Sequence, residues 1–197
     1  MNEPKSELVV IVTGPPRSGT SLMMRLLERA GLPLLIDETR PADASNPHGY
    51  FEFAPVRASA RDTQWLHHAG GRGVKVIDRL LGKLPLDRPY RVIVMNRPAE
   101  EVIASQNRML ARLGEESGRL PASRLKAILE LQTNEMRQLL SREACFDWIS
   151  ISYPRLVQNP RKECLRILDF LHSEPATDAT VEGMVAAVDA SLYRERA

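Results

Sequence analysis

Cysteines, long apolar runs and excess charge are all scarce in this 197-residue sequence, and each scarcity argues against a class of protein. The two cysteines, Cys145 and Cys164, form no Cys-x-x-Cys motif, so the sequence predicts neither a disulfide framework nor a zinc site. No apolar run approaches the roughly 18 residues that cross a bilayer. The formal net charge of +2 is too small to indicate a nucleic-acid partner. We therefore expect no membrane span and no nucleic acid among the partners.

What remains is the composition of an ordinary globular protein, with 43% hydrophobic and 26% charged residues. The length predicts a single domain over residues 1–197. Residues 1–7 lack the basic segment and apolar stretch of a signal peptide, which indicates a cytoplasmic protein. Arginine greatly outnumbers lysine, and its fork of N–H donors suits the recognition of small oxyanions.

The segment from residue 8 to residue 30 predicts a strand, a tight loop and a helix. The apolar run Leu8–Val12 leads into the loop Gly14–Ser21, and the apolar residues that follow have helical spacing up to Ala30. Gly31 then stops the helix. Such a loop presents backbone N–H groups and the positive end of the helix dipole to one point in space. The predicted ligand of this loop is a phosphate, although a plain strand-to-helix turn is the simpler alternative.

The loop resembles the G-x-x-x-x-G-K-[ST] pattern of nucleotide triphosphatases, with one important difference. Gly14, Gly19 and Ser21 fit the pattern, but Thr20 stands in place of the lysine, and the cation is Arg17 inside the loop. Without the lysine that reaches the β- and γ-phosphates, hydrolysis of ATP or GTP is disfavoured. A single phosphate or phosphosulfate group fits better.

Strands and helices alternate along the rest of the chain. The predicted strands are Leu32–Ile36, Val74–Ile77, Tyr90–Asn96 and Trp148–Ser152. The predicted helices are Pro55–His68, Pro98 to about Leu113, Ala122–Leu140, one opened by Asn159 and Pro160, and Asp178–Ala190. This alternation predicts an α/β protein with a P-loop NTPase-like, three-layer fold, in which helices flank a central parallel sheet. The segments Asp37–Gly49 and Gly114–Pro121 are predicted loops, where acceptor specificity would reside.

Arg97 and Ser105 are the second pair of candidate binding residues. Arg97 follows the strand Tyr90–Asn96, and ligands of parallel sheets bind at the carboxyl ends of the strands. Ser105 lies three residues after Val102 and four before Met109, so its hydroxyl falls on the apolar stripe of the helix. The alternatives are an ion pair between Arg97 and Glu101, and a serine bonded to its own helix backbone.

Together these motifs resemble the sulfotransferases that use 3′-phosphoadenosine 5′-phosphosulfate (PAPS). Pro16–Ser21 is similar to the phosphosulfate-binding loop of that family, and Arg97 with Ser105 is similar to its pair for the 3′-phosphate. Asn46–Glu52 resembles a segment common among small bacterial sulfotransferases, and Tyr153–Pro160 resembles the Tyr-Glu-Asp-Leu segment of the family. The resemblance extends from about Val9 to Pro160 and implies a PAPS-dependent sulfotransferase.

The resemblance also implies which residues bind the donor. It assigns the phosphosulfate to six loop residues: Pro16, Arg17, Ser18, Gly19, Thr20 and Ser21. Arg97 and Ser105 would bind the 3′-phosphate, and Tyr153 would either contact the adenine or pack in the core. By analogy with phosphoryl transfer, positioning and charge stabilisation suffice for this reaction, and we expect no metal.

The catalytic residues are less clearly marked. Glu52 is our first candidate for the base that takes a proton from the acceptor, and His48 is the second. The adjacent pair His67 and His68 is a weaker candidate, because adjacent helical residues point in different directions. The resemblance also implies that Lys75 matches a lysine of the family near the leaving oxygen, with a solvated lysine at a strand edge as the alternative.

Three functions are compatible with these residues. The leading one is sulfuryl transfer to a hydroxyl or amine of a small molecule, saccharide or lipid. A P-loop kinase or phosphotransferase is the second, and Thr20 at the lysine position counts against it. A catalytically silent nucleotide-binding protein is the third. The sequence specifies neither the acceptor nor the oligomeric state.

Overall fold

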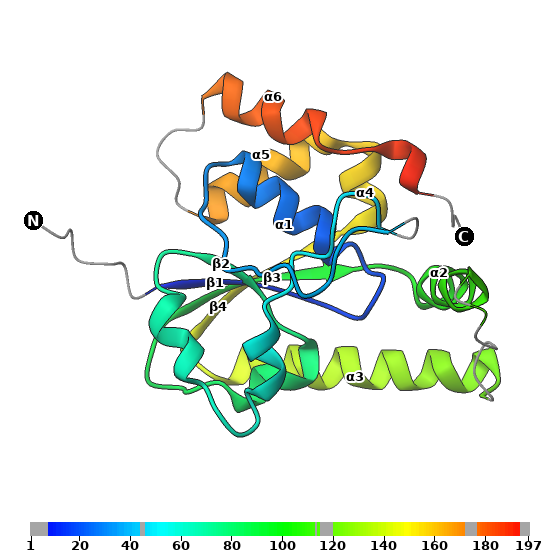
Figure 1. Cartoon of the computed structure of the whole chain (residues 1–197), viewed down its shortest axis with the longest axis horizontal. Helices are drawn as coiled ribbons and strands as arrows, with labels where there is room; N and C mark the ends of the chain where they lie inside the picture. The colour runs from blue at the N-terminus through cyan, green and yellow to red at the C-terminus, as the bar shows by residue number, and fades with distance from the viewer. Residues whose placement is uncertain (1–7, 44–45, 113, 115–119, 172–176, 194–197) are drawn as a thin grey trace, which may run out of the picture.

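The computed structural model describes residues 8–43, 46–112, 114, 120–171 and 177–193. Its centre is a parallel sheet of four strands in the order β2-β1-β3-β4 (Figure 1). The strands are β1 (Val9–Thr13), β2 (Gly73–Lys75), β3 (Tyr90–Asn96) and β4 (Phe146–Ser152). All five residues of β1 are buried, because strands cover it on both edges and helices cover both of its faces.

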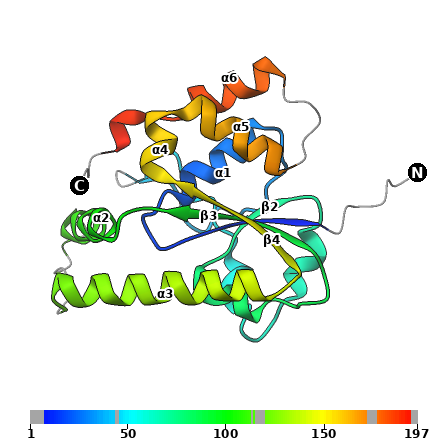
Figure 2. The same cartoon turned by 180° about the vertical axis from the view of Figure 1, so that it is seen from behind.

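Helices lie on both faces of the sheet, as Figures 1 and 2 show from opposite sides. One face carries α1 (Thr20–Arg29), α4 (Tyr153–Gln158), α5 (Pro160–Phe170) and α6 (Asp178–Ala186). The other face carries α3 (Ala122–Arg142) and three 3₁₀ segments, η1 (Ala54–Ala58), η2 (Gln64–His68) and η3 (Asp78–Lys83). Side chains of β1 alternate between the two cores, with Val9 and Ile11 on the α3 side and Val10 and Val12 on the α1 side. The predicted three-layer α/β fold is confirmed.

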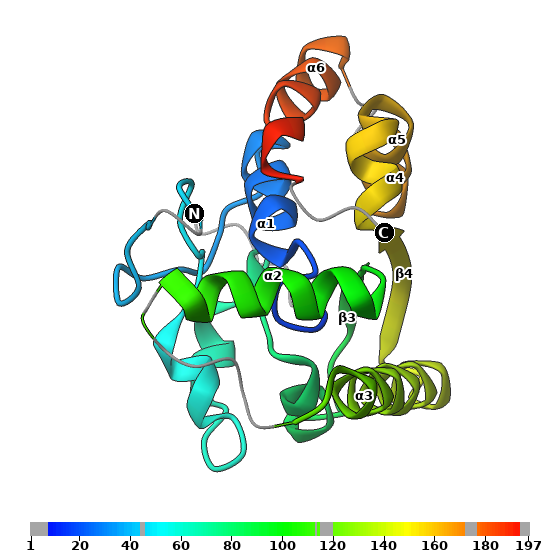
Figure 3. The ribbon, with the colours of Figure 1, turned by 90° about the vertical axis from the view of Figure 1, so that its right-hand side faces the viewer.

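Helix α2 (Ala99–Arg112) belongs to neither layer. It crosses in front of the carboxyl end of the sheet, as the view in Figure 3 shows. Its buried residues are Glu101, Val102 and Ser105, all in its first two turns. The helix therefore forms one wall of the region where the loop after β1 is located.

The predicted helix Pro55–His68 is wrong. The structure has two short 3₁₀ segments there, η1 (Ala54–Ala58) and η2 (Gln64–His68), separated by polar residues. Asp62 accepts a hydrogen bond from the backbone N–H of Gln64 at 2.8 Å, and this local turn competes with a continuous helix. A third 3₁₀ segment, η3 (Asp78–Lys83), follows β2 directly.

The predicted strand Leu32–Ile36 is also wrong, since this segment makes only one isolated bridge, from Leu34 to Gly73. Pro33 has no N–H to donate, which weakens pairing here. Strand β2 begins at Gly73 and ends at Lys75, short of the expected Ile77. Strand β4 begins two residues before the predicted Trp148.

Helix α4 was not predicted from the sequence. Ser152 accepts a hydrogen bond from the backbone N–H of Arg155 at 3.4 Å, and Pro154 lies in the first turn, so a helix begins where β4 ends. Helix α6 ends at Ala186, four residues early, and the short η4 (Ala190–Leu192) follows it. The predicted limits of β3 are confirmed.

Some expectations lie outside the described residues. They concern residues 1–7, the helix end at Leu113 and most of the loop Gly114–Pro121. Within the described part of the chain, no helix is both long and apolar enough to cross a membrane.

Candidate active site

The loop after β1 has a backbone that only particular residues permit. Gly14 and Gly19 have φ angles of 144° and 100°, and Arg17 has a φ of 70°, in the left-handed region. A Cβ on Gly14 would lie 2.6 Å from the carbonyl oxygen of Met95, and one on Gly19 would lie 2.4 Å from Cδ2 of Tyr153. The loop is therefore packed against the end of β3 and the start of α4, and glycine is required at both positions.

The loop retains polar groups that suit an anion. The N-cap of α1 is Gly19, which has no side chain to bond the N–H groups of the first turn, and these mark the positive end of the helix dipole. The Ser18 hydroxyl is fully buried and has no hydrogen-bond partner among the described residues. The backbone N–H of Ser18, which we expected to bind the ligand, instead donates to the carbonyl of Pro15 at 3.1 Å. The N–H groups of the first turn of α1 and the Ser18 hydroxyl fit a phosphate or sulfate oxygen.

Lys75, at the carboxyl end of the edge strand β2, supplies a cation beside this loop. Its Nζ donates to Oγ of Ser21 at 2.9 Å and also to the carbonyl of Tyr50. Burial lowers the pKa of Lys75 to about 8, and the nearby carboxylate of Glu52 partly opposes this shift. The alternative of a solvated edge lysine is therefore wrong.

Asn46 ties the segment Asn46–Glu52 to the loop. Its Nδ2 donates to Oγ of Ser21 at 3.0 Å and to the carbonyl of Gly49 at 2.6 Å. The Tyr50 hydroxyl donates to Asp43 at 2.7 Å in the same turn. Sequence reasoning noted this segment only as a resemblance and gave Asn46 no structural role, although asparagine followed by proline is a signal for a turn.

The two predicted phosphate sites are joined through Arg17. Its Nε donates to Oγ of Ser105 at 3.1 Å, and its carbonyl accepts from Nη1 of Arg97 at 3.1 Å. Burial lowers the pKa of the Arg17 guanidinium from its usual value, with Arg97 contributing in the same direction. Ser105 is 8% exposed and bonds to another residue's side chain, so the alternative of a self-bonded helix serine is wrong.

Arg97 is held in a buried cluster of aromatic and acidic side chains. Its Nε donates to Glu101 Oε2 at 2.8 Å, the ion pair that the sequence offered as an alternative. Its guanidinium lies 4.7 Å from the ring centre of Tyr153 and 5.4 Å from that of Tyr193. The Tyr193 hydroxyl donates to Glu101 Oε1 at 2.7 Å. Glu101 and Tyr193 were not predicted as site residues, because only the fold brings Tyr193 to α2.

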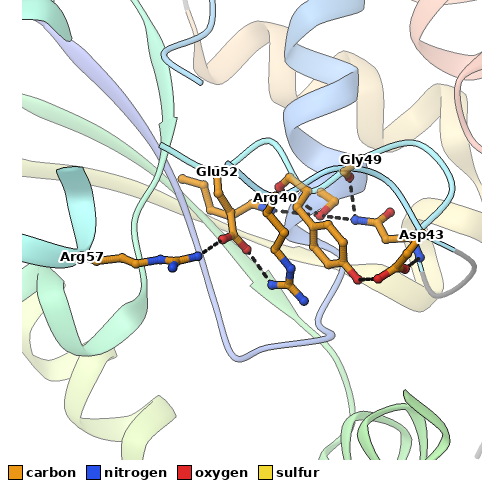
Figure 4. A network of polar contacts seen from close by, with 9 residues as sticks. Arg40, Asp43, Gly49, Glu52 and Arg57 are labelled. Carbon is orange, nitrogen blue, oxygen red and sulfur yellow. Dashed lines mark hydrogen bonds and ion pairs between the residues drawn. The ribbon is translucent and has the colours of Figure 1, made fainter. Parts of the chain in front are cut away.

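Glu52 lies between two arginines, as Figure 4 shows. Its Oε1 accepts from Arg40 at 2.9 Å and its Oε2 accepts from Arg57 at 2.8 Å. The guanidinium of Arg40 also lies 3.5 Å from the ring centre of Tyr50. Each carboxylate oxygen of Glu52 thus accepts one bond from an arginine and keeps a second lone pair that can accept a proton.

His48 is placed less favourably than Glu52. Its imidazole is 44% exposed, and its Nε2 lies 4.0 Å from Oδ2 of Asp189. His48 does not line the cavity above the loop. His67 and His68 are exposed on η2 and do not line it either.

A cavity of about 520 Å³ connects these residues. Its wall includes most of the predicted donor-binding residues together with Lys75 and Glu52. Among the described residues, eight basic side chains line it and Glu52 contributes the one carboxylate. The basic residues are Arg17, Arg40, Arg57, Lys75, Arg79, Arg97, Arg108 and Arg112. The cavity is therefore suited to an anionic ligand with more than one charged group. Among the described residues, no group of three His, Cys, Asp or Glu side chains could hold a metal ion.

Comparison with solved structures identifies the fold. The sulfotransferase domain of the Synechococcus PCC 7002 olefin synthase superposes with a TM-score of 0.54 at 15% identity, covering 100% of this chain and 90% of that one. Retinol dehydratase in complex with androsterone and the inactive cofactor PAP gives a TM-score of 0.56 at 12% identity, covering 94% of this chain and 65% of that one. The sulfotransferase domain from the curacin biosynthetic pathway gives 0.52 at 15% identity, over 94% of this chain and 88% of its own.

These likenesses show that the chain has the fold of the sulfotransferases, the fold that its motifs implied. At such low identity they show the fold and not the activity. No protein-family model matches the sequence, and no curated protein matches it either.

Proposed function

We propose that the protein is a cytoplasmic, PAPS-dependent sulfotransferase, which transfers a sulfuryl group to an acceptor hydroxyl or amine and releases 3′-phosphoadenosine 5′-phosphate (PAP). One observation carries the proposal: three adjacent strands each contribute a cation to one cavity. Lys75 ends β2, Arg17 lies in the loop after β1, and Arg97 follows β3. The solved complex of retinol dehydratase with PAP supports the same choice of donor.

Each cation has a distinct role in this proposal. Arg17, the hydroxyl of Ser18 and the N–H groups at the start of α1 bind the 5′-phosphosulfate. Arg97 binds the 3′-phosphate with help from Ser105, and the ion pair with Glu101 keeps the guanidinium at the cavity wall. Tyr153 packs against Arg97 beside the adenine. Together they fix the donor so that the sulfuryl group points toward Lys75.

Lys75 and Glu52 act on the two sides of the transferred group. The acceptor oxygen forms a bond to sulfur as the bond from sulfur to the bridging phosphate oxygen breaks, and the phosphate keeps the electron pair. Lys75 and Arg17 stabilise the charge that develops on that oxygen. Glu52, held by Arg40 and Arg57, accepts the proton of the acceptor hydroxyl through a lone pair that neither arginine uses.

A catalytically silent nucleotide-binding protein is the second candidate, favoured by the engagement of both Glu52 oxygens. The experiment that separates the two is transfer of label from ³⁵S-PAPS into a cell extract, with free PAP measured in parallel. Labelled product and an equal amount of PAP support the enzyme. PAP binding without any label transfer would support the silent protein, and no binding of PAP would reject both.

A further inference from the structure

We propose that the acceptor carries an anionic group, such as a carboxylate, sulfate or phosphate ester, which binds to Arg57 and Arg79 beside an apolar wall. This inference rests on the proposed sulfotransferase activity, because it names the class of acceptor. It begins with the division of the cavity into two sides. The side next to β3 contains Arg17, Arg97 and Ser105, which the donor would use.

The side next to β2 is where the acceptor must enter. In-line transfer places the acceptor opposite the leaving phosphate, so it approaches from the side of the cavity away from Arg97 and Ser105. The residues on this side come from the segment around Glu52, from η1 and from the chain that follows Lys75. Phe53, Val56, Val76 and Ile77 form its apolar wall.

On this side, the described lining of the cavity has three arginines and one carboxylate, that of Glu52. Arg40 and Arg57 share this carboxylate, and Arg79, an exposed residue in the first turn of η3, lines the same cavity. Asp37 and Asp78 act electrostatically on Arg57 and Arg79 but do not line the cavity. Arg40 lies against the Tyr50 ring and is close enough to Lys75 to lower its pKa, so it lies near the reacting group. Arg57, at 57% exposure, and the exposed Arg79 are the other two arginines of this side and the residues available to a second anion.

The pairing of Glu52 gives this anion a second effect. An acceptor anion that binds Arg57 competes with Glu52 for the same guanidinium. One oxygen of Glu52 is then released while Arg40 still holds the other. The anionic group thus anchors the acceptor and loosens one of the two ion pairs that hold Glu52 in the same event. A neutral acceptor would leave both arginine pairs closed.

The test uses calorimetry on the full chain saturated with PAP, in EDTA. The probes are 4-hydroxyphenylacetate and its neutral amide, 4-hydroxyphenylacetamide, which differ little in shape. We expect the acid to bind roughly tenfold more tightly or better, because a charge-assisted pair with arginine is lost in the amide. The ratio of the affinity for the acid to that for the amide should fall toward one in Arg79→Gln and in Arg57→Gln. Arg61 is exposed and lies outside the cavity, so Arg61→Gln is the matched control and should keep the ratio of the unmodified protein.

Equal binding of acid and amide, no binding of either, or a preference that survives both substitutions would overturn the inference. Unfolding temperatures of the variants check that each protein remains folded. The donor proposal fails separately, if the protein does not bind PAP at all. In that case the same titrations on the PAP-free protein test whether Arg57 and Arg79 bind an anionic group. Tighter binding of the acid that is lost in Arg79→Gln supports this subsite, and equal binding of acid and amide rejects the subsite.

Discussion

At the scale of single residues, Lys75 carries the charge that the loop sequence lacks at Thr20. Lys75 lies in strand β2, outside the loop, and the parallel register of β2 with β1 sets it opposite Val12 beside the loop. Its Nζ contacts Ser21, the residue that fits the hydroxyl position of the triphosphatase pattern. Lys75, on the neighbouring strand, therefore supplies a cation in place of the lysine that the triphosphatase pattern has at the position of Thr20.

The pKa of Lys75 predicts how PAP binding depends on pH. Burial lowers this pKa to about 8, so the lysine is mostly protonated at pH 7 and mostly neutral at pH 9. Because the anion prefers the protonated form, binding should weaken about tenfold between pH 7 and pH 9, with proton uptake at the higher pH. Calorimetry in buffers of different ionisation enthalpy measures both effects. In Lys75→Met the step around pH 8 should disappear; the same step in the variant would assign it to another group.

Glu52 gives a second prediction at this scale. Glu52→Gln keeps the size of the side chain but removes the oxygen that accepts a proton, so the rate of sulfuryl transfer should fall roughly 100-fold to 10,000-fold. PAP affinity should change little, since we propose that Glu52 acts on the acceptor and not on the donor. Transfer assays and calorimetry provide the two readouts. Glu38→Gln, at an exposed position outside the cavity, is the matched control. Unchanged transfer in Glu52→Gln would remove Glu52 from the mechanism.

Single residues also show what sequence could and could not predict about the site. The donor-binding positions could be found because they are neighbours in sequence and share a recognisable motif. The contacts of Glu52 with Arg40 and Arg57 depend on how two loops fold back on each other, which no local pattern encodes. Tyr193 reaches Glu101 across 92 positions, and nothing near either residue indicates that contact.

At the scale of elements, a strong pattern of apolar residues predicted the limits of an element correctly, and a weak pattern did not. Strand β3 is a continuous apolar run buried by two neighbouring strands, and its limits were predicted correctly. The segment Pro55–His68 has few apolar residues, and local side-chain hydrogen bonds divide it into two 3₁₀ turns. These turns carry Arg57 onto the cavity wall, so the missed structure bears directly on the site.

The loop between β1 and α1 predicts the effect of adding one methyl group. In Gly19→Ala the new Cβ would clash with Tyr153 at 2.4 Å and would occupy a φ of 100°, so stability should fall by about 1–3 kcal/mol. PAP binding should weaken with it, because the loop must move. Denaturant unfolding and calorimetry measure the two losses. Gly183→Ala, where a Cβ meets nothing within 4 Å, should be neutral or slightly stabilising. Equal stability of both variants would contradict the described loop.

At the scale of the whole molecule, the sheet order explains why the site lies where it does. Strand β1 is flanked by β2 and β3, so the loop after β1 has a neighbouring strand end on each side. One side brings Arg97 and the other brings Lys75. The sequence predicted parallel strands and the shared edge, but not the order of the strands. Which cation lies on which side of the loop follows only from that order.

The most direct test of the central claim is the affinity for PAP in the absence of divalent metal. Calorimetric titration of the full chain in EDTA with PAP, and with AMP, which lacks the 3′-phosphate, isolates the contribution of the second phosphate site. We predict that PAP binds at least roughly tenfold more tightly than AMP, as expected for one well-formed pair between arginine and phosphate. PAP binding no tighter than AMP, or stabilisation by magnesium and ATP alone, would contradict a site built for PAPS.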